Sequence, residues 1–177
     1  MKLNESIRPY VPSTLVVLLL LSVPLIAMQF TAEVNWSFGD FLLAALLLMT
    51  TGVLLTRASL AVADLRIKIA TGLTLLSVLT LIWINLAVGL IGSEGTWQNM
   101  LFFLIPVILL MGAFRSSLNP VGMVYTLLAM ALFQALVILL LAFILPSTDL
   151  LLPELILCSI FILIWLLAAR LYQSAVS

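Results

Sequence analysis

The stretch KIATGLTLLSVLTLIWINLAVGLIG, residues 68–92, decides the fold class of this chain. It carries no charged residue after Lys68, and it exceeds the roughly 20 apolar residues that an α-helix needs to cross a bilayer. Its apolar residues run on without the alternation of a membrane β-strand, and a backbone in lipid has to satisfy its hydrogen bonds internally. The stretch therefore predicts a transmembrane helix.

Further apolar runs of similar character flank this stretch on both sides. Hydrophobic residues make up 65% of the chain and charged residues 8%, against about 25% charged in soluble globular domains. We predict an all-α integral membrane protein, one transmembrane domain over residues 1–177, with short loops. The six predicted helices cover approximately residues 13–30, 38–56, 68–92, 97–114, 121–145 and 151–170. The fourth and sixth could be short or tilted, because they contain few strictly apolar residues.

The basic residues all fall on one side of the six predicted spans. They are Lys2, Arg8, Arg57, Arg66, Lys68, Arg115 and Arg170. The opposite side receives most of the acids, namely Glu33, Asp40, Glu94, Asp149 and Glu154. The positive-inside rule then predicts that both termini lie in the cytoplasm. An odd number of spans would destroy this separation.

Several classes of chemistry lack their residues. The chain has no histidine, so Ser-His-Asp and Cys-His catalysis and histidine-ligated zinc or haem are excluded. The glycines form no phosphate-binding motif, and the zero net charge gives no field for nucleic acid. The lone Cys158 lies in an apolar run and is expected to be inert. We therefore expect no catalytic residue, no metal, no cofactor and no nucleic-acid partner.

Polar and small residues of the third predicted helix share one face. Thr71, Thr74, Ser77, Asn85, Gly89 and Gly92 fall within an arc of about 120°. Asn85 needs a hydrogen-bond partner at this depth, and Gln29 or Gln134 could supply it. One interpretation is a helix-packing face that uses Ser77, Gly89, Gly92 and Gln134. The other is the lining of a polar cavity that opens outward.

A second group of polar residues is predicted at the outer ends of the first three helices. It consists of Glu33, Asn35, Trp36, Asp40, Asn85 and Glu94. Oxygen ligands of this kind suit a hard cation, although loop carboxylates are more often solvated or bonded to backbone amides. Asp40 also stands at a predicted helix start, where capping is favoured over catalysis. We treat the group as a hypothetical ligand-binding cluster without a metal.

Two segments carry a resemblance to known sequences. FTAEVNWSFGDF (residues 30–41) and WINLAVGLIGSE (residues 83–94) resemble a family of small, uncharacterised bacterial membrane proteins over residues 26 to 100. That family reads Asp where this chain has Ala32, so one acidic group is missing here. The resemblance implies a bacterial inner membrane and points to the same polar residues, but it implies no reaction.

Two functional hypotheses follow. The favoured one is a noncatalytic accessory or assembly subunit, with the lipid bilayer around it and a second copy or another membrane protein as partner. The alternative is a small transporter or channel for a cation or neutral solute, motivated by Asn85 at membrane depth. An enzyme is the least favoured class, because the catalytic groups are missing.

Overall fold

The computed structural model describes residues 7–92, 95–145 and 152–176. Within these ranges, six helical segments are long and apolar enough to cross a membrane, so the six predicted apolar helices are confirmed. In chain order the elements are η1 (Arg8–Tyr10), α2 (Val11–Phe30), α3 (Phe38–Ala61), α4 (Leu65–Ala87), η2 (Trp97–Phe103), α5 (Leu104–Ser116), α6 (Pro120–Ile144) and α7 (Leu152–Ser174). The fourth span is thus a 3-10 helix that continues into a short α-helix.

The chain divides into two compact units. Unit 1 ends at Ala61 and contains η1, α2 and α3, whereas unit 2 begins at Val62 and contains the remaining elements.

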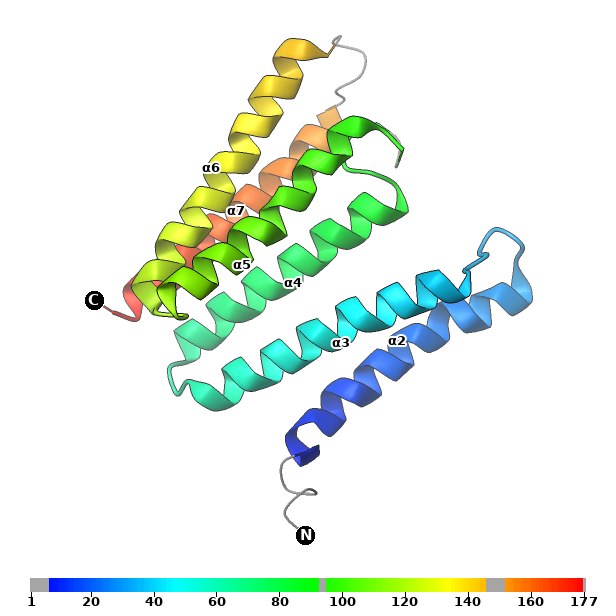
Figure 1. Cartoon of the computed structure of the whole chain (residues 1–177), viewed down its shortest axis with the longest axis horizontal. Helices are drawn as coiled ribbons and strands as arrows, with labels where there is room; N and C mark the ends of the chain where they lie inside the picture. Colours follow the sequence, from blue (N-terminus) through cyan, green and yellow to red (C-terminus); the bar gives the residue numbers. More distant parts are fainter. Residues whose placement is uncertain (1–6, 93–94, 146–151, 177) are drawn as a thin grey trace. The chain divides into compact units, whose positions relative to one another are not determined.

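Unit 1 is an antiparallel hairpin of α2 and α3, shown in blue to cyan in Figure 1. Its helices meet where Ser13 Oγ lies 2.6 Å from Thr56 Oγ1 and donates to the Gly52 carbonyl at 3.3 Å. A side chain at position 52 would crowd Ser13, because an added Cβ would lie 3.1 Å from Ser13 Cβ. Val17 is the only buried residue of α2, and Ala44 the only one of α3. Both helices therefore leave many of their large apolar side chains exposed.

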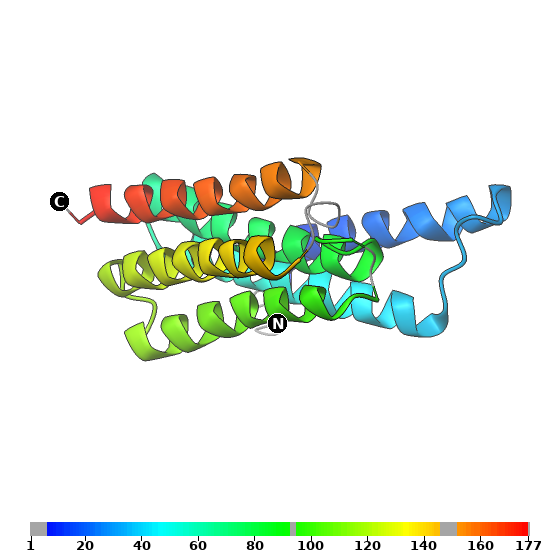
Figure 2. The same ribbon diagram turned by 90° about the horizontal axis from the view of Figure 1, so that it is seen from above.

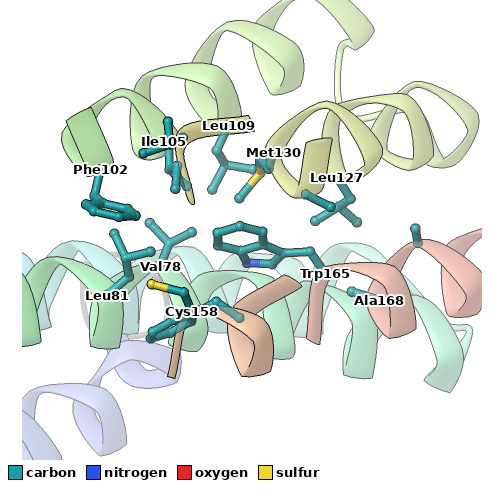
Figure 3. Close-up of a cluster of buried hydrophobic side chains, with 14 of the residues drawn as sticks. Val78, Leu81, Phe102, Ile105, Leu109, Leu127, Met130, Cys158, Trp165 and Ala168 are labelled. Atoms are coloured by element: carbon teal, nitrogen blue, oxygen red, sulfur yellow. The ribbon is translucent and has the colours of Figure 1, made fainter. Parts of the chain in front are cut away.

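Unit 2 is a bundle of four helices. α6 packs between α5 and α7, α7 also packs on α4, and η2 contacts α4. Figures 1 and 2 show these helices running alongside one another, with α4 antiparallel to α7. At their centre, Figure 3 shows the Trp165 ring between Val78 of α4 and the side chains of Leu109 and Met130. Trp165 and Met130 are fully buried.

α4 is held at both ends by local hydrogen bonds. Asp64 caps its start by accepting the Arg66 N–H at 2.7 Å. At the other end, Val88 and Gly89 both donate to the Ile84 carbonyl at 3.0 Å, and Gly89 adopts φ +83°. A glycine in this left-handed conformation ends a helix, because other residues meet a steric penalty there.

The early end of α4 corrects one sequence prediction. The third predicted helix extended to residue 92, with Gly89 and Gly92 on its packing face. In the structure both glycines lie beyond Ala87 with positive φ, so that prediction is wrong for them. They shape a loop and do not contribute to a helix face.

The basic residues of unit 2 gather at one end of the bundle. Arg66 and Lys68 lie in the first turn of α4, Arg115 in the last turn of α5 and Arg170 near the end of α7. We call this the basic end, and we call the opposite end, which carries Gly89 and Gly92, the glycine end. Arg66 bridges α4 and α7 at the basic end by donating to the Ser174 carbonyl, and it pairs with Asp64 at 3.0 Å.

Gly112 allows α5 and α6 to pack closely, because it has no side chain. A Cβ at Gly112 of α5 would overlap the side chain of Thr126 on α6, whereas a Cβ at Gly72 of α4 would meet nothing within 4 Å. We expect Gly112→Ala to destabilise unit 2, because the helices would have to separate. Gly72→Ala should be neutral or stabilising by up to about 1 kcal/mol, because alanine favours helix.

Unfolding of both variants in mixed micelles, compared with the wild type, measures this difference. Equal stabilities of the two variants would show that α5 and α6 do not approach as closely as the structure has them.

Candidate functional site

The densest polar network in the described part of unit 2 is centred on Asn99 of η2, whose side chain is 3% exposed. Its Oδ1 accepts the main-chain N–H groups of Leu90 at 2.9 Å and Ile91 at 3.0 Å. Its Nδ2 donates to the Ile91 carbonyl at 3.1 Å and to Thr96 Oγ1 at 2.9 Å. One buried amide thus satisfies the loop that follows α4, where helical hydrogen bonds have ended.

Asn85 joins this network from the last turns of α4. Its side chain is 3% exposed, and its Nδ2 donates to the Asn99 carbonyl at 2.8 Å. The predicted need for a partner is therefore met by main chain of η2. Gln134, one of the two partners considered from the sequence, bonds to α7 instead, and Gln29 belongs to unit 1. Among the described residues, Asn85 Oδ1 has no hydrogen-bond partner.

A carboxylate closes the same loop from α7. Glu154 Oε1 accepts the Gly92 N–H at 2.7 Å. Glu154 lies in the first turn of α7, where the positive end of the helix dipole also stabilises an anion. The glycine end of unit 2 is therefore tied together by side chains from η2, α4 and α7.

The polar face of α4 is largely used inside unit 2. Ser77 Oγ accepts the indole N–H of Trp165 at 3.0 Å, and Thr71 Oγ1 lies 2.7 Å from Tyr172 OH. Thr74 is buried, and its hydroxyl donates a hydrogen bond to the Ala70 carbonyl of the same helix at 2.8 Å. Thr71, Ser77 and Asn85 thus join α4 to α7 and η2, as a packing face would.

Gln134 of α6 contacts α7 instead of α4. It is fully buried, and its Nε2 donates to the Cys158 carbonyl at 2.7 Å. Its Oε1 has no hydrogen-bond partner among the described residues. Cys158 itself is a buried free thiol.

Four of the remaining members of the predicted cluster lie in unit 1. Glu33 and Asn35 are exposed in the α2–α3 loop, and Trp36 packs edge-on against Phe41 with ring centroids 5.2 Å apart. Asp40 Oδ2 accepts the Ser37 N–H at 2.7 Å, which is a capping arrangement at the start of α3. Glu94 lies outside the described residues.

The five described members of the cluster fall in different units. Asn85 belongs to unit 2 and the other four belong to unit 1, so their convergence stays a prediction. In the described ranges, no group of three or more His, Cys, Asp or Glu residues is placed to hold a metal ion. What the network does chemically is to satisfy main-chain groups.

The sequence did not lead us to Asn99 or Trp165 as members of the polar contacts. It also did not predict that Glu154 bonds to the loop after α4. Asn99 had a detectable signal, because it is an amide inside the largely apolar segment 97–103. Its target could not be inferred, because a bond from Asn99 to Leu90 depends on how η2 folds back on the loop.

The helices and the polar network together define a multi-pass helical membrane protein in which polar groups serve helix and loop packing. Comparison with known protein families, curated proteins and solved structures gave no match to this chain.

Proposed function

We propose that this protein is a noncatalytic subunit that assembles with other membrane proteins or with further copies of itself. The observation that carries the proposal is that the polar face of α4 is used within unit 2, by Thr71 to Tyr172, by Ser77 to Trp165 and by Asn85 to Asn99. A face used in this way serves packing, because its side chains make contacts between helices.

The small burial of the helices in unit 1 supports the same proposal. Only Val17 and Ala44 of α2 and α3 are buried, and Leu19 and Leu46 are exposed by 68% and 63%. Inside a bilayer such faces contact lipid or another helix. A hairpin with so little burial of its own can pack its apolar faces on further helices.

The structure gives less support to the transport hypothesis than to the assembly proposal. It needs Asn85 to face an aqueous route, but the Asn85 side chain is 3% exposed and its amide group is bonded to η2. Asn85 Oδ1 has no hydrogen-bond partner among the described residues, but a permeating ion or solute would reach it only after the packing around this buried residue had opened.

We further propose that the protein lies in a bacterial inner membrane with both termini in the cytoplasm. The collection of Arg66, Lys68, Arg115 and Arg170 at the basic end of unit 2 supports this orientation. In unit 1, Arg57 donates to Tyr10 OH at 3.4 Å, so the end of α3 lies beside the start of α2.

Affinity purification at native expression tests the assembly proposal. The tagged chain, crosslinked in intact membranes before solubilisation, should be recovered with a partner in fixed stoichiometry or as a discrete oligomer. The matched control crosslinks a mixture of membranes that carry the tagged chain with membranes that carry an isotope-labelled proteome. A true partner then comes from the tagged cells alone. Recovery of the monomer without any stoichiometric partner would contradict the proposal.

A further inference from the structure

Three buried side-chain oxygens of unit 2 are acceptors without a donor among the described residues, and one of them is Gln98 Oε1 of the half-buried Gln98 on η2. The other two belong to buried residues and are Asn85 Oδ1 on α4 and Gln134 Oε1 on α6. Both residues are more than nine-tenths buried, and each already donates one amide hydrogen to a main-chain carbonyl. A buried amide oxygen is costly when left without a hydrogen bond, and lipid supplies no donor.

The helix register brings these two oxygens to one level of the bundle. Thr71 pairs with Tyr172 and Ser77 with Trp165, so α4 and α7 run antiparallel and advance at nearly equal rates. Continued over two turns from Ser77 to Asn85, this register reaches the turn of α7 that contains Cys158. The Cys158 carbonyl is the acceptor of Gln134 Nε2. α4, α6 and α7 therefore each place a polar group at this level.

The character of these groups selects the ligand. Both open positions are acceptors, so the ligand has to be a hydrogen-bond donor. The carboxylates of the described part of unit 2 are Asp64, at the basic end, and Glu154, which accepts the Gly92 N–H. Among the described residues, a cation at the Asn85 level would have no dedicated counter-charge, and a buried cation without one is strongly unfavourable. A neutral donor of small size fits these conditions.

We propose that internal water, as a single molecule or a short chain, is bound between α4, α6 and α7 and donates to Asn85 Oδ1 and Gln134 Oε1. Buried waters typically make about three hydrogen bonds to polar groups that are otherwise unsatisfied. The Cys158 thiol, at the same level, is a further weak partner. The water links the glycine end of α4 to the middle of α6, which no direct hydrogen bond does.

Nuclear magnetic resonance on the full chain in nanodiscs tests this proposal. With Asn and Gln side-chain amides labelled with nitrogen-15, the Asn85 and Gln134 amide protons should show cross-peaks to water with the sign of a long-lived bound molecule. Gln134→Leu should abolish the water cross-peak of Asn85. Ser159→Ala, an exposed change one residue from Cys158, should leave it intact.

Three results would overturn the proposal. The first is the absence of bound-water cross-peaks at both side chains in the wild type, which does not depend on whether any variant folds. The second is an Asn85 cross-peak that persists in a folded Gln134→Leu protein. The third is a shift of the Asn85 and Gln134 signals when choline replaces sodium or potassium at constant ionic strength, because this would identify a cation as the ligand.

Discussion

Asn99→Leu is expected to lower the free energy of unfolding by about 2–6 kcal/mol, among the largest losses available to a single substitution in this protein. The leucine would leave the N–H groups of Leu90 and Ile91 buried without an acceptor, each at a cost of about 1–3 kcal/mol. It would also remove the bond from Asn99 Nδ2 to the Ile91 carbonyl. Reversible unfolding in mixed micelles, followed by tryptophan fluorescence, measures the loss.

Two control variants separate the loss of the Asn99 hydrogen bonds from the general effect of replacing an asparagine by leucine. Asn99→Asp keeps the acceptor Oδ1 but exchanges the amide donor for an ionisable carboxyl group, so it should cost less than Asn99→Leu when unfolding is measured at acid pH, where the carboxyl is neutral. Asn35→Leu makes the same chemical change at an exposed position and should stay within about 0.5 kcal/mol of the wild type. Should Asn99→Leu prove as mild as Asn35→Leu, the loop would not depend on this amide.

Trp165→Ala is expected to cost about 3–5 kcal/mol, because it removes the largest fully buried side chain and leaves a cavity between the four helices. Trp165→Phe keeps most of the packing and loses the hydrogen bond to Ser77 Oγ, so it should cost clearly less. The exposed Trp97, with 54% of its surface accessible, supplies the matched control.

Thermal unfolding monitored by size-exclusion chromatography in detergent should therefore rank Trp165→Ala far below Trp165→Phe, and Trp97→Ala close to the wild type. Similar losses for the two alanine variants would mean that Trp165 is not the centre of the core.

Only part of the candidate site could be predicted from the sequence. Its main contacts join residues of α4 to residues of a loop and of other helices, and no single periodicity relates them. The face with Thr71, Ser77 and Asn85 was found from helical spacing, and all three residues lie on α4 as that spacing requires. The same spacing failed at Gly89, because the left-handed backbone there ends the helix and redirects the chain. Helical periodicity carries no information beyond such a point.

The apolar runs of the sequence alone determined that the chain forms six long apolar helices, since a backbone in lipid has to bond within its own segment. The positions of its arginines and lysines likewise determined which residues share the basic end of unit 2. Both are local properties, set by the composition of one segment at a time.

Only the tertiary structure decided which polar groups meet. That Asn99 closes the loop after α4, that Trp165 bonds Ser77, and that Gln134 reaches α7 rather than Asn85 all depend on helix rotation and register. In a chain with 65% hydrophobic residues, many rotations bury similar apolar area, so the hydrophobic pattern does not distinguish among them. Hydrogen bonds have specific partners and directions, and these select the arrangement that forms.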